Sequence, residues 1–193
     1  GIFISVLVFA LIFLFTSLIG ISPYNSFWSN FERSEGIFQL LHYIIFFALT
    51  ATLFNSKTEW RRLLLFTLAV SFLVSLYGLG QWMELQTGNS NFKYTINTGG
   101  RSSGTLGNPS YLSGYLIFHF FFIIWLIGEP AVKKYLKWIL GVVLLLELAV
   151  FLATKTIAAI FALMAGVFFV IILYARRTYK LHKKNPNSKI FIY

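Results

Sequence analysis

A loop near the middle of the chain combines a cation, several glycines and the start of a helix. Residues 99–112 read Gly-Gly-Arg-Ser-Ser-Gly-Thr-Leu-Gly-Asn-Pro-Ser-Tyr-Leu and lie between two long apolar runs. Glycine adopts positive φ easily and lets a ligand approach the main chain closely. Arg101 adds a permanent positive charge. The loop therefore predicts an anion site, with phosphate or pyrophosphate as its natural ligand.

The end of this loop should begin a helix. Asn108 is a favourable N-cap, and Pro109 fits the first helical position, where its missing N–H costs no hydrogen bond. The helix is expected from Tyr111 to about Ile127, with its positive dipole end directed at Arg101 and the glycines. A surface loop with turn glycines and an ordinary capped helix is the alternative interpretation.

A second group of polar residues falls on one helical stripe. Glu35, Gln39 and His42 are spaced i, i+4 and i+7 at the start of an apolar segment. Polar side chains inside a membrane cost free energy, which suggests that they have a function. We expect these three to line a polar cavity beside the glycine-rich loop. A buried, hydrogen-bonded trio that holds helices together is the alternative.

The remaining ionisable residues in apolar segments suggest structural roles. Glu147 is the single acid deep in its segment, and Lys155 lies on about the same face, roughly 12 Å along the axis at ~1.5 Å per residue. An ion pair would require Lys155 to reach back. His119, among phenylalanines, is expected to be an interior histidine. With three His, no Asp and no Cys, no metal site or cofactor is expected.

Two motifs carry a resemblance to a known family. Residues 101–116 read Arg-Ser-Ser-Gly-Thr-Leu-Gly-Asn-Pro-Ser-Tyr-Leu-Ser-Gly-Tyr-Leu. They resemble the R-x-x-G-T-x-G-N-P-N-x-L-A-x-x-L signature of the bacterial O-antigen ligase/polymerase family. Residues 26–36 read Ser-Phe-Trp-Ser-Asn-Phe-Glu-Arg-Ser-Glu-Gly, followed by Leu41 and His42. They resemble the family's SFWGNxERxEG…LH segment, and the two motifs stand in the family's order.

The resemblance extends over roughly residues 21 to 166 and departs from the family at two places. Ser110 stands where the family usually has Asn, and Thr154-Lys155-Thr156 stands where it usually has Ser-Arg-Gly. Lys155 keeps the positive charge at that position. The resemblance and the charge pattern assign these residues to a pyrophosphate site: Arg33, Arg101, Gly104, Thr105, Gly107, Asn108 and Lys155.

Composition independently indicates a membrane protein. Hydrophobic residues make up 58% of the chain, aromatic residues 19% and charged residues 11%. Six apolar segments are each close to the ~20 residues that a helix needs to cross ~30 Å of hydrocarbon. They are Ile2–Ile21, Gly36–Phe54, Leu63–Met83, Tyr111–Ile127, Trp138–Ala153 and Ile157–Tyr174. The fifth and sixth are short, and buried hairpin helices are the alternative there.

The expected fold is therefore an all-α, polytopic transmembrane helical bundle with about six spans. Residues 189–193 read as the start of a seventh span, and the chain begins inside an apolar run. We expect residues 1–193 to be a single transmembrane domain and an internal piece of a longer protein.

The basic residues predict its orientation. Twelve of the sixteen lie in one set of loops, which the positive-inside rule places in the cytoplasm. The other set holds only Arg33, Lys93, Arg101 and Lys155. The glycine-rich loop should then face outward, and the net charge of +10 reflects topology and anionic lipid rather than nucleic acid.

The resemblance implies a multi-pass glycosyltransferase of the bacterial cytoplasmic (inner) membrane. Its substrate would be a polyprenyl-diphosphate-linked glycan, transferred on the outer face to an acceptor sugar or lipid. The cations would stabilise the diphosphate leaving group. No residue can be assigned as the catalytic base. Since the family's acceptor machinery lies in a large later loop, this piece alone should be inactive.

Two other function classes remain. A lipid-linked oligosaccharide flippase would also need polar stripes and an anion site, but transporters typically have internal repeats with interrupted helices, and the sequence has neither. A membrane scaffold would have no need of the Arg101 loop.

Overall fold

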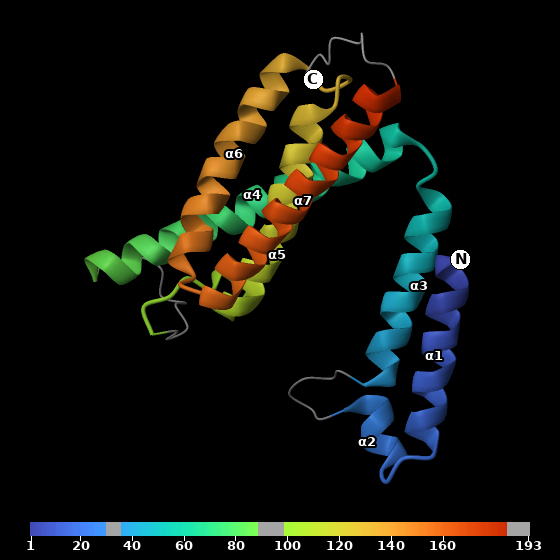
Figure 1. Cartoon of the computed structure of the whole chain (residues 1–193). Helices are drawn as coiled ribbons and strands as arrows, with labels where there is room; N and C mark the ends of the chain where they lie inside the picture. Colours follow the sequence, from blue (N-terminus) through green and yellow to red (C-terminus); the bar gives the residue numbers. More distant parts are fainter. Residues whose placement is uncertain (30–35, 89–98, 185–193) are drawn as a thin grey trace. The chain divides into compact units, whose positions relative to one another are not determined.

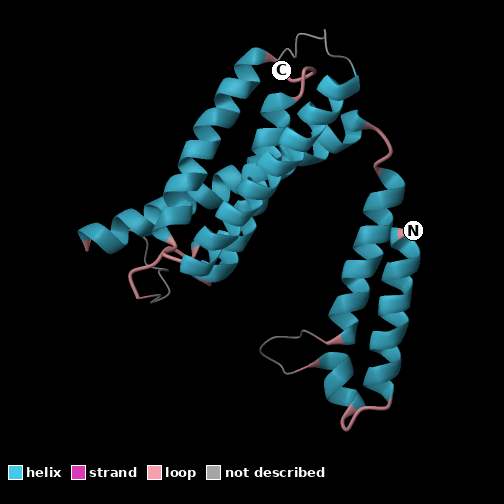
Figure 2. Ribbon diagram, in the orientation of Figure 1, coloured by secondary structure: helices cyan, strands magenta, loops and turns pink. Residues whose placement is uncertain are grey.

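The described part of the chain is helical throughout. A computed structural model describes residues 1–29, 36–88 and 99–184, and these residues form helices and loops without a strand (Figures 1 and 2). The elements are α1 (Ile2–Leu18), α2 (Pro23–Trp28), α3 (Ile37–Leu53), α4 (Lys57–Thr87), the 3₁₀ turn η1 (Gly104–Leu106), α5 (Pro109–Gly128), α6 (Lys134–Ala153) and α7 (Ile157–Lys184). The all-helical fold class is confirmed.

Within the described residues, each of the six expected apolar segments contains a helix, but only four helices are long and apolar enough to cross a membrane. These four are α4, α5, α6 and α7. With 17 residues each, α1 and α3 extend about 26 Å at ~1.5 Å per residue, less than ~30 Å of hydrocarbon. The count of six spans is therefore not confirmed. The expected start of a seventh span lies outside the described residues.

The two segments that looked short in the sequence form long helices. Helix α6 begins at Lys134 instead of Trp138, and α7 continues past Tyr174 to Lys184. Lysine and arginine favour helix and can bury their stems along apolar surface, so a helix extends beyond its apolar stretch. This length argues against hairpin helices in α6 and α7.

The chain divides into two compact units, Gly1–Trp60 and Arg61–Tyr193. In the first unit α1, α2 and α3 pack together, with ring contacts between Phe3 and Phe47 and between Trp28 and Phe38. A Cβ on Gly36 would lie 2.2 Å from the Phe27 carbonyl oxygen. Only glycine fits there, which gives the last residue of the 26–36 motif a packing role.

The second unit is built around α5, which packs against α6 and α7. One apolar cluster includes Leu68, Ile123 and Leu140, and another includes Leu116 and Val150. Buried polar side chains also lie along α4, α5 and α6. They are Ser71, His119 and Glu147.

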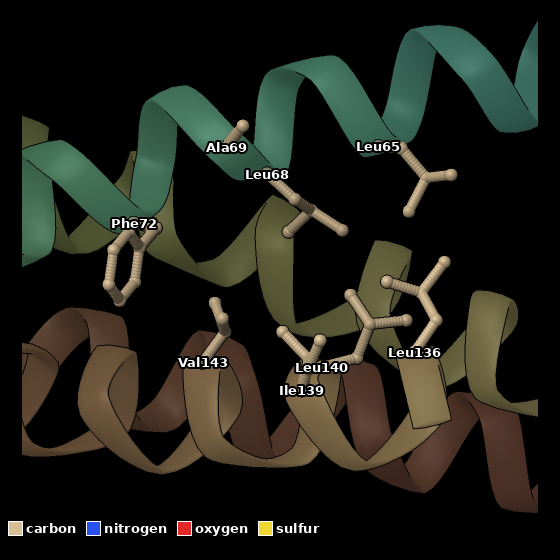
Figure 3. A pocket seen from close by; sticks show the side chains of 8 residues that line it. All are labelled: Leu65, Leu68, Ala69, Phe72, Leu136, Ile139, Leu140 and Val143. Carbon is tan, nitrogen blue, oxygen red and sulfur yellow. The ribbon is translucent and has the colours of Figure 1, made fainter. Parts of the chain in front are cut away.

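A groove of about 250 Å³ lies between α4 and α6 in this unit. Figure 3 shows its side chains facing one another from the two helices. All of them are apolar: Leu65, Leu68, Ala69, Phe72, Leu136, Ile139, Leu140 and Val143. The groove therefore offers an anion no hydrogen-bond donor or charge.

Candidate functional site

The glycine-rich loop has the backbone conformation that its glycines predict. Gly99, Gly100, Gly104 and Gly107 all have positive φ, between 56° and 74°. At Gly104 a Cβ would also approach the Leu112 side chain to 3.3 Å. An L-residue at these positions would be strained.

The loop ends in the expected helix cap. The Asn108 side-chain oxygen accepts a hydrogen bond from the Ser110 amide at 2.8 Å, and Pro109 opens α5. The prediction of an N-cap followed by proline is therefore confirmed. This cap already uses one of the amides at the N-terminus of α5.

Gln81 of α4 fixes the other side of the loop. Its Oε1 accepts hydrogen bonds from the main-chain N–H groups of Ser103 at 2.8 Å and Gly104 at 2.9 Å, while its Nε2 donates to the Ser103 hydroxyl. The Gln81 side chain is only 2% exposed. The buried Gln81 side chain thus supplies the hydrogen-bond acceptor that a main-chain carbonyl would supply to these two N–H groups in a helix or sheet.

The sequence motifs do not single out Gln81, although a periodic signal exists. Ser71, Ser75, Gly78 and Gln81 are spaced i, i+4, i+7 and i+10, which places them on one face of α4. All four are buried in the structure. This stripe of small and polar residues marks the face of α4 that meets the loop and α6.

The C-terminal end of α6 provides a second anchor. The Ser102 amide donates to the Ala153 carbonyl at 3.0 Å, and the Ser102 hydroxyl donates to the Gly78 carbonyl at 2.9 Å. The amides of Ser102, Ser103 and Gly104 are therefore engaged within the protein. These amides are not available to bind an anion, so the candidate donors are the neighbouring cations Arg101 and Lys155.

Arg101 is held at the turn between α6 and α7. Its Nε donates to the Thr154 carbonyl at 2.8 Å and its Nη2 to the Thr156 hydroxyl at 2.9 Å. The side chain is half-buried. These two bonds fix the plane of the guanidinium, and the α6 C-terminus, the negative end of its dipole, favours a cation there.

Lys155 occupies the same turn. It lies between the two threonines that bind Arg101, its side chain is exposed, and its φ is +50°. The structure therefore brings Arg101 to the turn that contains Lys155, 54 positions later in the sequence. Thr156, the second of these threonines, supplies a hydroxyl acceptor for Arg101.

The other expected site residues lie on the glycine-rich loop, on α3 or outside the described residues. Thr105 and Asn108 are exposed beside Gly107 on the loop. Arg33 and Glu35 lie outside the described residues. Gln39 is half-buried on α3, and His42 is exposed, with its Nδ1 at 2.7 Å from the Phe38 carbonyl of its own helix.

The described parts of this site thus consist of one fixed guanidinium, one exposed ammonium and the loop of positive-φ glycines that carries the guanidinium. Comparisons with protein-family models, with curated proteins and with solved structures found no match for this chain.

Proposed function

We propose that this chain is part of a membrane glycosyltransferase of the O-antigen ligase type. Its substrate is a polyprenyl-diphosphate-linked glycan, which it transfers to an acceptor sugar or lipid on the outer face of the bacterial inner membrane. The observation that carries the proposal is the fixed placement of Arg101 at the end of α6, where it donates to Thr154 and Thr156 on either side of Lys155. Both residues lie in or next to positions of the family motifs.

The chemistry is displacement at the anomeric carbon of the donor sugar. The acceptor oxygen forms the new glycosidic bond, the bond to the diphosphate oxygen breaks, and the diphosphate leaves with the electron pair. Two cations at that oxygen lower the energy of the transition state, since negative charge develops there. The polyprenyl tail lies in the bilayer with the apolar helices. Arg101 and Lys155 stabilise charge in this scheme, and the base is supplied elsewhere.

A lipid-binding experiment tests the site directly. Polyprenyl diphosphate should raise the melting temperature of the purified protein more than polyprenyl monophosphate does at equal concentration. Ligand that binds only the folded state stabilises it by RT ln(1 + [L]/Kd), so a difference in affinity becomes a difference in stability. Arg101→Gln should remove most of this difference. Lys134→Gln, which changes an exposed lysine at the far end of α6, should keep it.

Equal stabilisation by both lipids would contradict the proposal. A flippase is distinguished by a second measurement with the protein that contains this chain, in vesicles loaded with labelled donor. Movement of the donor across the membrane without transfer to an added acceptor would favour the transporter over the glycosyltransferase.

A further inference from the structure

The middle of the second unit contains a buried acid without a cation. Glu147 of α6 is fully buried, and its Oε1 lies at hydrogen-bond distance, 2.5 Å, from the Ser71 hydroxyl oxygen of α4. Its second oxygen, Oε2, has no hydrogen-bond partner among the described residues. The ion pair with Lys155 that the sequence left open is not formed, since Lys155 is exposed beyond the end of α6.

The two side chains that interact with Glu147 among the described residues, Ser71 and Tyr115, carry hydroxyl groups. The phenol of Tyr115, on α5, is the second side-chain neighbour of Ser71 and is close enough to Glu147 to interact with its charge. His119 lies one turn further along α5, with its Nδ1 at 2.8 Å from the Tyr115 carbonyl. Two further buried atoms, the Ser75 hydroxyl and His119 Nε2, also have no partner among the described residues.

The surrounding helices provide no compensating charge. Helix α4 carries no charged residue between positions 63 and 83, and α7 carries none between 157 and 175. On α5 the titratable groups are Tyr111, Tyr115 and His119, and on α6 the nearest charged residue to Glu147 is Lys137, almost three turns away. An ionised carboxylate with one unpartnered oxygen in this position would be strongly disfavoured relative to the neutral acid.

We propose that Ser71, Tyr115 and Glu147 form a proton-binding site within the membrane, in which Glu147 is an uncharged acid. In this state the acid O–H on Oε1 donates to Ser71, and the Ser71 hydroxyl donates to Tyr115. Oε2 is then a carbonyl oxygen, which tolerates the lack of a partner far better than a carboxylate oxygen does.

Proton loss would reverse this chain of hydrogen bonds. The Tyr115 O–H would then donate to Ser71, and Ser71 would donate to the Glu147 carboxylate. The three side chains are hydrogen-bonded in both states, but only the neutral state places no charge among these uncharged stretches of helix. The site does not depend on the proposed transfer reaction, and it lies apart from the Arg101 loop along α6.

Infrared difference spectroscopy of the purified protein in lipid nanodiscs tests this assignment. Wild type minus Glu147→Gln at neutral pH should contain the carbonyl-stretch band of a protonated carboxylic acid, and the band should shift in heavy water. Glu129→Gln, at the half-buried end of α5, is the matched control and should remove only carboxylate bands. Ser71→Ala should move the acid band to higher frequency, because the acid O–H loses its hydrogen-bond acceptor.

Stability provides an independent readout. A glutamine is the neutral equivalent of a protonated glutamate, so Glu147→Gln should melt within a few degrees of the wild type. Should that variant fail to accumulate, the Ser71→Ala minus wild-type spectrum carries the same test. Carboxylate bands alone at neutral pH would overturn the proposal. So would carboxylate bands that change with sodium but not potassium, which would make Glu147 a sodium ligand.

Discussion

At the scale of single residues, the phosphate-site candidate depends on a residue that carries no charge. Gln81 satisfies two main-chain donors of the loop that presents Arg101. A glutamine can do this because its one carbonyl oxygen accepts two hydrogen bonds while its NH₂ donates a third. Gln81 of α4, 20 residues before Arg101 in the sequence, therefore helps to position the arginine by holding the loop that carries it.

Gln81→Leu should destabilise the protein by about 2 to 4 kcal/mol, because it leaves buried amide donors unpaired at about 1–3 kcal/mol each. Thermal unfolding in detergent measures the change. The matched control is Gln86→Leu on the exposed side of the same helix, which should alter the melting temperature little. Similar losses in both variants would mean that Gln81 contributes no more than any helix glutamine.

Variants of Lys155 can separate an effect on the stability of the protein from an effect on ligand binding. Its φ of +50° is unfavourable for any residue with a Cβ, by roughly 1 kcal/mol or more. Lys155→Gly should therefore raise the melting temperature without ligand while it reduces the preference for polyprenyl diphosphate. Lys155→Arg should change neither, since it keeps both the charge and the strain. A glycine variant that binds the diphosphate as well as wild type does would remove Lys155 from the site.

At the scale of elements, the loop and the helices form one packed structure, and Gly78 is where they meet. A Cβ there would lie 2.9 Å from Val150 Cγ1 on α6 and 3.2 Å from the Ser102 hydroxyl oxygen. Valine is short and β-branched, so it has little freedom to move away. The approach of α4 to α6 therefore depends on the absence of a side chain, as in other close contacts between membrane helices.

Gly78→Ala should destabilise the protein by about 1–3 kcal/mol through overpacking. Val150→Ala in the same chain should recover part of that loss, and a double-mutant cycle of melting temperatures measures the coupling. The control is Gly141→Ala on α6, where an added Cβ meets nothing within 4 Å, so helix propensity should stabilise the protein by about 0.5–1 kcal/mol. Strictly additive effects of the two alanines would contradict the contact.

The elements were more predictable from the sequence than the contacts between them. Apolar runs and the Asn108-Pro109 cap depend on local composition and predicted the helices and the start of α5. The docking of Arg101 on residues 154 and 156 could not be predicted, because it is a long-range contact and no local pattern records it. The two apolar clusters likewise follow from how α4, α5 and α6 pack, which spacing alone leaves undetermined.

At the scale of the whole molecule, the distribution of charge predicts which side of the membrane each loop faces. The chain has no cysteine, so single-cysteine variants are directly interpretable. Thr105→Cys, on the exposed part of the glycine-rich loop, should react with an impermeant thiol reagent added to intact cells. Ser56→Cys and Ala131→Cys, in exposed turns beside clusters of basic residues, should react only after the membrane is opened. The opposite pattern would reverse the orientation and place Arg101 in the cytoplasm.

The two anchors of the Arg101 loop also impose an order on how the protein is made. Gln81 precedes the loop, whereas the Thr154 carbonyl follows Arg101 by 53 residues. At ~5–20 residues per second, the ribosome needs about 3–10 s to reach that residue. Until then the nascent chain can form the Gln81 anchor of the loop but not the anchor at Thr154. The bonds from Arg101 to Thr154 and Thr156 therefore cannot form until α6 and the turn after it have been synthesised.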